Sequence, residues 1–196
     1  MAVPLALPSA GGTAPADRRS AFPLAVVAIG LALTTLTAGL VAAYLTLRSG
    51  AAEWPPEDAS RDTYTAVTLA VTMILGMVTI EWAAFSIRRR ERGQSLAAMA
   101  ITLGFAIAFI NGLYYLITQI EAGVGDSAYF TVVHALLVVP FLAGLLALIF
   151  VLVTLVRNAG HQLSEANYWL MRGTANFWHI AAVMYIAAYY TIFITK

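Results

Sequence analysis

The sequence predicts an all-α polytopic membrane protein, a bundle of five transmembrane helices, on the strength of three observations. First, 61% of the residues are hydrophobic and 11% are charged, whereas soluble domains have about 45–50% apolar and about 25% charged residues. Second, five apolar runs are each long enough to cross a hydrocarbon core of about 30 Å. Third, arginine-rich, acidic or proline-containing segments separate these runs.

The N-terminal stretch differs in composition from everything that follows it. Residues 1–21 contain several prolines, the pair Gly11-Gly12 and the basic pair Arg18-Arg19. This pattern is typical of a flexible tail that ends in a basic stop before the membrane. We therefore expect a flexible cytoplasmic tail over residues 1–21 and one five-span membrane domain over residues 22–196.

Charged or helix-breaking residues bound the five expected spans. The first span ends at Arg48, and the following Trp54-Pro55-Pro56 cannot continue a helix. The second ends in the run Arg88-Arg89-Arg90-Glu91-Arg92, and the fourth contains Pro140, which is expected to kink it. The spans are expected at residues 22–47, 63–87, 96–120, 128–156 and 173–195.

Basic residues are distributed unequally between the two sides of the membrane. With five spans, the N-terminal tail, the 88–95 loop and the 157–172 connection share one side and together contain eight Lys and Arg residues. The opposite side contains three, Arg48, Arg61 and Lys196. Because cytoplasmic loops carry the excess of Lys and Arg, the N-terminus is expected in the cytoplasm and the C-terminus outside.

Small residues recur every four positions on three of the expected spans. Such repeats allow the backbones of neighbouring helices to approach closely, so the sequence predicts a tight bundle. The repeats are Gly39-Ala43, Gly104-Ala108-Gly112 and Ala143-Ala147.

Polar or amphipathic residues inside the apolar runs are the candidate functional positions. They are Glu81, Asn111, His134, Asn176, Trp178 and His179. Such side chains are costly in a membrane unless they find partners, so they either join helices or mark a functional path. We favour interhelical hydrogen bonding for the histidines and amides, and a snorkelling or hydrogen-bonded acid at Glu81. Proton handling is the alternative.

The expected depth of these residues relates them to one another. Glu81 lies near the inner end of the second span, and His179 lies about two turns inside the fifth, so we expect direct or one-water contact between them. His134 belongs to the outer half of the fourth span, roughly 15–20 Å from His179 along the membrane normal. This separation is too large for both histidines to ligate one haem iron.

The count of possible metal ligands limits the chemistry of this chain. It has no cysteine, which excludes disulfides, thiolate zinc sites and iron–sulfur clusters. Its three histidines, His134, His161 and His179, are fewer than a haem-copper reaction centre needs. We therefore expect no metal or cofactor in this chain. Its net charge of +1 gives no indication of a nucleic acid partner.

Four segments occur in the order found in one known family. They are residues 38–48 with Trp54-Pro55-Pro56, residues 102–109, residues 129–138, and Phe177-Trp178-His179. In order, spacing and expected orientation they resemble the motifs of subunit III of haem-copper oxygen reductases, in its short five-helix form. The chain departs from that pattern at acids, because Leu33 replaces the first-span glutamate and Ala182 replaces the aspartate that follows the tryptophan–histidine pair.

The resemblance implies an accessory, non-catalytic subunit of an aerobic respiratory oxidase in the bacterial plasma membrane. Haem and copper are then expected in the partner catalytic subunit I, with subunit II and phospholipids as further partners. A related helper subunit of nitric oxide reductase shares the same frame and stays open as an alternative. A small independent transporter or a haem- or quinone-binding membrane protein are alternatives from other classes.

Overall fold

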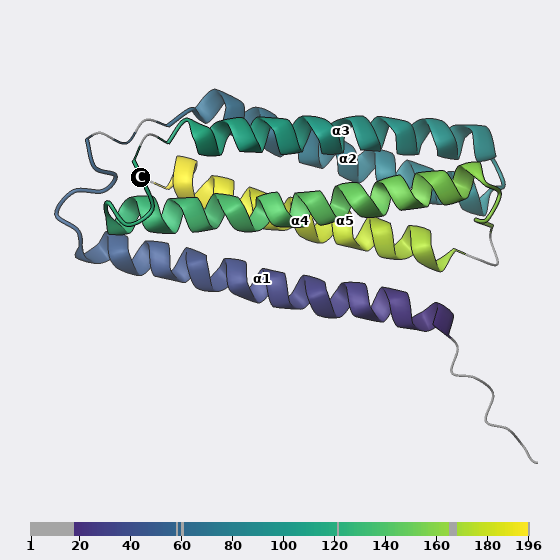
Figure 1. Ribbon diagram of the computed structural model, residues 1–196, viewed down its shortest axis with the longest axis horizontal. Helices are drawn as coiled ribbons and strands as arrows, with labels where there is room; N and C mark the ends of the chain where they lie inside the picture. The colour runs from purple at the N-terminus through teal and green to yellow at the C-terminus, as the bar shows by residue number, and fades with distance from the viewer. Residues whose placement is uncertain (1–17, 58, 60, 121, 165–167, 196) are drawn as a thin grey trace, which may run out of the picture.

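The computed structural model describes residues 18–57, 59, 61–120, 122–164 and 168–195. These residues form an all-α bundle in which long helices run side by side and successive helices are antiparallel (Figure 1). The helices are α1 (Arg18–Gly50), α2 (Thr63–Arg88), α3 (Arg92–Thr118), α4 (Ala128–Ala159), α5 (Trp169–Tyr189) and a π-helical turn, η1 (Tyr190–Ile194).

The predicted fold class is confirmed, because five of the described helices are long and apolar enough to cross a membrane. Their ends extend beyond several of the expected spans. α1 begins at Arg18 inside the expected tail, and α5 begins at Trp169. Helices can continue past the hydrocarbon region into the polar interface, where hydropathy no longer marks them. Residues 1–17 of the expected tail lie outside the described residues.

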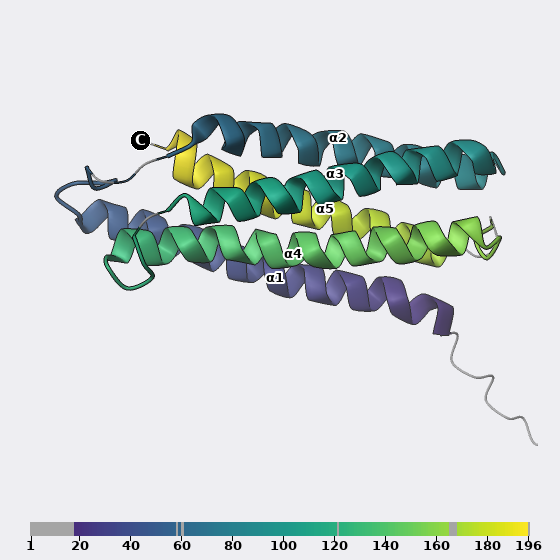
Figure 2. The ribbon, with the colours of Figure 1, turned by 45° about the horizontal axis from the view of Figure 1, so that its top comes forward.

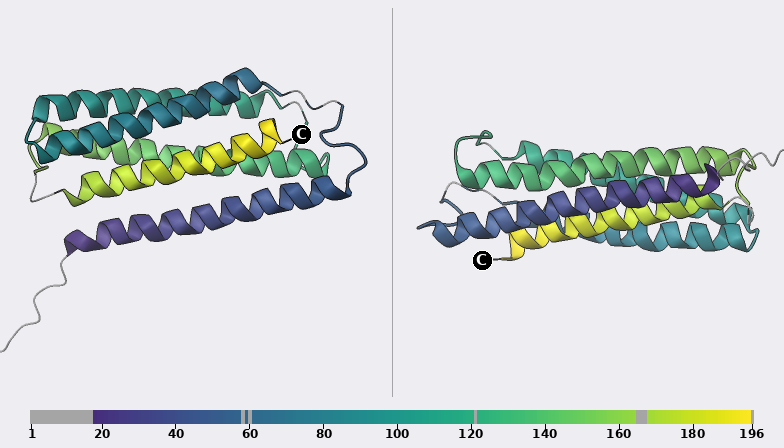
Figure 3. Two further views of the ribbon diagram at one scale, coloured as in Figure 1. Left: turned by 180° about the vertical axis from the view of Figure 1, so that it is seen from behind. Right: turned by 90° about the horizontal axis from the view of Figure 1, so that it is seen from below.

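α5 is the central helix of the bundle. It packs against α1, α2 and α4, whereas α3 packs against α2 and α4. In the most apolar 18-residue stretch of α5, half of the residues are buried, whereas 17% are buried in the corresponding stretch of α1. Figures 2 and 3 accordingly show α1 at one edge of the bundle, crossing α4 and α5 on the side away from α3. α1 therefore leaves most of its surface to lipid or to another protein.

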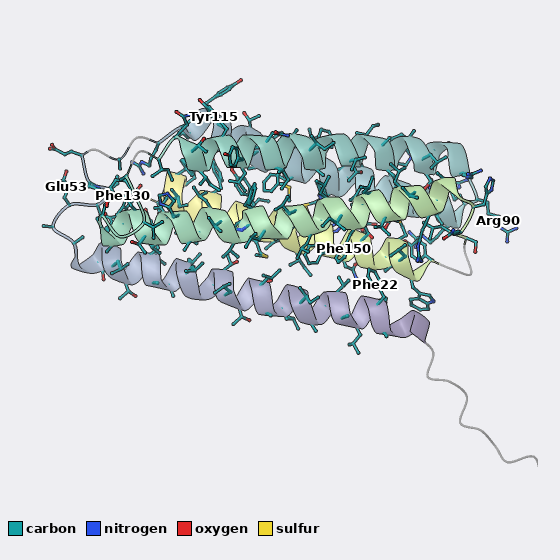
Figure 4. All side chains as sticks on the ribbon, in the orientation of Figure 1. Phe22, Glu53, Arg90, Tyr115, Phe130 and Phe150 are labelled. Carbon is teal, nitrogen blue, oxygen red and sulfur yellow. The ribbon has the colours of Figure 1, made fainter. Side chains whose placement is uncertain are left out.

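Aromatic rings fill the spaces between the helices. The rings of Phe109 on α3 and Tyr185 on α5 meet edge to face at 5.0 Å, and so do those of Phe150 and Phe177. Phe22 extends this chain of rings to α1, with its ring centroid 5.7 Å from that of Phe150. Figure 4 shows Phe22 near the end of the bundle at which α2 and α4 finish, called the basic end here because Arg88, Arg89 and Arg157 lie there. Edge-to-face pairs contribute about 0.5–1.5 kcal/mol beyond the area they bury.

Close approach of α5 to its neighbours depends on glycines opposite large side chains. A Cβ atom at Gly76 of α2 would collide with the indole of Trp178, and one at Gly173 would collide with the ring of Phe22. At both positions a glycine provides the space that a large ring occupies. α4 continues unbroken through the buried Pro140, and the kink expected there stays a prediction.

The small-residue repeats have mixed outcomes. Ala143 and Ala147 are buried in α4, as expected. Gly39 and Gly104 are exposed, and no atom outside their own local backbone lies within 4 Å of the position that a Cβ would take. The prediction of close helix contact is therefore wrong for these two glycines, but it is confirmed at Gly112, where a Cβ would collide with Leu69 of α2. A four-residue repeat places small residues on one face of a helix but does not tell which face points inward.

Two helices end in the same way at the basic end of the bundle. The N–H of Glu91 donates to Ser86 O at 2.9 Å beyond α2, and the N–H of Gln162 donates to Arg157 O at 2.9 Å beyond α4. These are Schellman closures, which place one residue in the left-handed region. Arg90, with φ of 61°, and His161, with φ of 59°, occupy that position. Glycine is the usual residue there.

The contact between Gly76 and Trp178 can be tested with two glycine-to-alanine variants. We expect Gly76→Ala to lower the free energy of unfolding in detergent micelles by about 1–3 kcal/mol, because the new methyl group overpacks a filled interface. Gly104→Ala is the matched control and is expected to be neutral or stabilising, by up to about 1 kcal/mol, through helix propensity. Equal tolerance of the two substitutions would contradict the described packing.

Candidate functional site

A charged cluster lies between α2 and α5, about two turns before the C-terminal end of α2. The Nε2 atom of His179 is 3.7 Å from Oε1 of Glu81. The guanidinium of Arg172 approaches the same oxygen, with Nη1 at 4.0 Å. The predicted proximity of Glu81 and His179 is confirmed. Sequence reasoning missed Arg172, although its position seven residues before His179 places both on one face of α5.

The cluster is directed towards the outer surface of the bundle. The exposed fractions of the side chains are 41% for Glu81, 48% for Arg172 and 32% for His179. Ion pairs this exposed contribute only about 0–1 kcal/mol to stability. Their polar groups are available to water, to lipid headgroups or to a neighbouring protein. The cluster is therefore a candidate binding site and not part of the buried core.

The hydrogen bonds of His179 determine what the pair can do chemically. Its Nδ1 atom lies 2.6 Å from the carbonyl oxygen of Ala175 on the same helix, so Nδ1 carries a proton and donates it. In the neutral ring Nε2 is then a bare acceptor that faces the Glu81 carboxylate. The pair therefore places two acceptor atoms side by side between α2 and α5, where a donor from water, lipid or a neighbouring protein can bridge them.

Two buried aromatic side chains of α5 donate hydrogen bonds to the backbone of α2. Nε1 of Trp178 donates to Met73 O at 3.2 Å, and the hydroxyl of Tyr185 donates to Ala66 O at 2.9 Å. Both side chains are almost fully buried. The interhelical bond expected of Trp178 is present. Tyr185 was not among the candidate positions, and only its place two turns after Trp178 signals that both face α2.

The three remaining candidate residues are satisfied locally or only partly buried. Nδ1 of His134 donates to Phe130 O at 2.8 Å, and Nδ2 of Asn111 donates to Ile107 O at 2.8 Å, each within its own helix. Asn111 is exposed, and Asn176 is half-buried without a hydrogen bond in the described part of the chain. The interhelical bonds expected of these residues are not found among the described residues. A carbonyl four residues earlier offers a nearer partner.

Hydroxyl and amide pairs join the other helices. The hydroxyls of Thr154 on α4 and Thr174 on α5 lie 2.7 Å apart, and Asn158 of α4 donates to Ser95 of α3 at 2.9 Å. The hydroxyls of Thr79 and Thr102 likewise connect α2 to α3. The positions of these residues in the sequence hardly indicate such pairs, because Ser and Thr also bond to their own helix. No group of three His, Asp or Glu residues that could hold a metal is found in the described residues.

The fold and the distribution of polar groups define a class, the polytopic helical membrane proteins whose buried polar side chains join one helix to the next. The sequence matches the family described as Cytochrome c oxidase subunit III over residues 25–196. The chain belongs to the cytochrome c oxidase subunit III family.

Individual relatives support the same assignment. The chain is 28% identical over 148 residues to the cytochrome c oxidase subunit 3 of Oncorhynchus clarkii and to that of Gadus morhua. It is 27% identical to that of Paracentrotus lividus over the same length. Each alignment covers 71% of this chain and 54% of the relative. The chain thus spans about half the length of these relatives.

A double-mutant cycle tests the coupling of Glu81 to His179. We expect the free-energy changes of Glu81→Gln and His179→Gln on unfolding to be non-additive by about 0.2–1 kcal/mol, because the two side chains touch at a partly exposed site. The cycle of Glu81→Gln with Asn111→Ala is the control and is expected to be additive. Additivity in both cycles would show that Glu81 and His179 do not interact.

Proposed function

We propose that this chain is an accessory, cofactor-free subunit of an aerobic respiratory haem-copper oxidase. The observation that carries the proposal is the family match over residues 25–196, which includes nearly all of the described bundle. In this proposal haem and copper belong to the catalytic subunit I. The chain packs beside subunits I and II, stabilises the catalytic subunit and binds phospholipid.

The surface of the bundle supports a role in assembly. α1 buries a small share of its apolar residues within the chain, and large side chains such as Leu24 and Leu31 are 71% and 63% exposed. On α3 the amide side chain of Asn111 also faces outward. Apolar surface alone would be satisfied by lipid, whereas an outward-facing amide gains most from a protein neighbour.

We also propose an orientation and a location for the chain. α2 and α4 end, and α3 and α5 begin, at one end of the bundle (Figure 1). Arginines concentrate at that end, which is therefore placed in the cytoplasm with the N-terminus. The C-terminus then lies outside, and the membrane is the plasma membrane of a bacterial cell. The arginines are Arg88, Arg89, Arg90, Arg92, Arg157 and Arg172.

Affinity purification of the tagged chain in a mild detergent tests the proposed partnership. We expect a haem-copper catalytic subunit and subunit II to co-purify in fixed stoichiometry, with an oxidase absorption spectrum. The tagged chain purified alone is expected to lack a Soret band, because its two membrane histidines, His134 and His179, hydrogen-bond to carbonyl oxygens of their own separate helices. Recovery of a nitric oxide reductase, or a stoichiometric Soret band in the isolated chain, would overturn the proposal.

The two membrane histidines are expected to matter for assembly more than for catalysis. We expect His134→Leu and His179→Leu to reduce the amount of assembled complex several-fold, since a loss of about 1–2 kcal/mol in stability has that effect on abundance. Turnover per assembled complex should change little, because both histidines hydrogen-bond to carbonyl oxygens of their own helices, which is a structural role. Haem content and oxygen consumption, measured on the same preparations, separate the two effects. Full assembly with abolished turnover would assign these histidines to the chemistry.

A further inference from the structure

A cavity of ≈ 620 Å³ opens at the basic end of the bundle, between the α2–α3 turn and the connection from α4 to α5. Arg90 and Arg92 line it from the first segment, and His161 and Ser164 line it from the second. Ile87 and Leu163 add apolar surface. Figure 4 shows Arg90 projecting from this end, opposite the end that carries Glu53. The cavity is distinct from the cluster around Glu81.

The backbone at two of the lining residues is unusual in the same way. Arg90 and His161 both occupy the left-handed position of a Schellman closure, where glycine avoids a steric penalty. At the end of α4 a glycine is present, but it stands one residue earlier, at Gly160. Ending either helix does not require a long side chain at this position. The strain therefore points to a use for the two side chains in the cavity that both of them line.

Arg92 is fixed in place by the end of α4. Its Nε atom donates to Asn158 O at 3.2 Å, and its two Nη atoms contact Ala159 O and Nε2 of His161. A guanidinium has five N–H donors, so these contacts leave donors for a ligand. Because the group is already held in position, binding costs little further loss of side-chain freedom.

The donor groups that line the cavity indicate the chemistry of its ligand. Among the described residues, two guanidinium groups, an imidazole and a hydroxyl line it, and all of these groups can donate hydrogen bonds. Glu91, the nearest described acid in sequence, pairs with Arg89 at 3.5 Å. Arg90 and Ser164 also take part in contacts of their own, so a ligand would join an existing network. Guanidinium groups match the geometry of phosphate oxygens.

We propose that this cavity binds a phosphate group that carries net negative charge, supplied by an anionic phospholipid headgroup or by a soluble phosphate. Arg90 and Arg92 bind the phosphate oxygens, and His161 and Ser164 contribute further hydrogen bonds. The apolar side chains of Ile87 and Leu163 lie beside the place where the acyl part of a lipid would leave the site.

The inference deepens the lipid-binding part of the proposed function, but it does not require the oxidase partnership. Binding is measured on the full chain alone, whereas the partnership is measured by co-purification. If phosphate binding is not observed, the co-purification result still tests the partnership, and the reverse is also true.

Replacing the strained residues by glycine gives a sharp test. Arg90→Gly combined with His161→Gly removes both side chains and supplies the residue that the left-handed backbone favours, so the melting temperature should stay unchanged or rise. In native mass spectrometry of the full chain, we expect the double variant to bind phosphatidylglycerol about tenfold more weakly than the natural sequence does, through loss of charge-assisted hydrogen bonds.

Two controls complete the experiment. Arg157→Gln removes one positive charge from the same end of the bundle but lies outside the cavity, and it should retain phosphatidylglycerol binding. Zwitterionic phosphatidylcholine should bind weakly to every variant. Displacement of phosphatidylglycerol by millimolar inorganic phosphate supports a soluble phosphate as the ligand, and retention supports the lipid. Equal phosphatidylglycerol binding by the double variant and the natural sequence, or no preference over phosphatidylcholine, overturns the proposal.

Discussion

The indole of Trp178 lies across Gly76 of α2 and donates a hydrogen bond to Met73 O at 3.2 Å, and the rest of the bundle depends on this contact. Lipid is as apolar as leucine, so close packing and interhelical hydrogen bonds must hold membrane helices together. Tyr185 repeats the same attachment two turns later, on the carbonyl of Ala66. With α5 fixed to α2 in this way, its other faces meet α1 and α4.

Polar groups are divided between the inside and the outside of the bundle according to their charge. The groups that join helices in the interior are neutral, such as the hydroxyls of Thr154 and Thr174 and the amide of Asn158. The ionisable cluster of Glu81 and its partners faces outward, and the arginines gather at one end. Neutral pairs are cheap to bury, whereas a charge is costly both in the interior and against lipid tails, so the Glu81 cluster depends on its own paired groups and on polar groups outside the bundle. The interior is therefore a scaffold, and the groups able to act on other molecules lie at the surface.

The five helices and one contact of the candidate site could be predicted from the sequence. The hydrocarbon core demands about 20 apolar residues per span, so hydropathy located the helices but not their polar ends. Regular helical rise related the depths of Glu81 and His179 correctly. Periodicity could not distinguish Gly76, which is packed, from Gly104, which is exposed, because the difference lies in a tryptophan on another helix. The sequence did not indicate that Arg90 and His161 are special positions, because what distinguishes them is their left-handed backbone conformation.

The attachment of α5 to α2 is tested most directly by removing the two donors. Tyr185→Phe deletes only the hydroxyl that donates to Ala66 O, whereas Trp178→Phe deletes the donor to Met73 O together with part of the ring that packs on Gly76. The free energy of unfolding in mixed micelles should fall by about 0.6–1.7 kcal/mol for Tyr185→Phe and by more for Trp178→Phe. Tyr190→Phe is the control, because Tyr190 is 58% exposed, and it should not change this value. If all three variants unfold like the natural sequence, these bonds do not hold the bundle together.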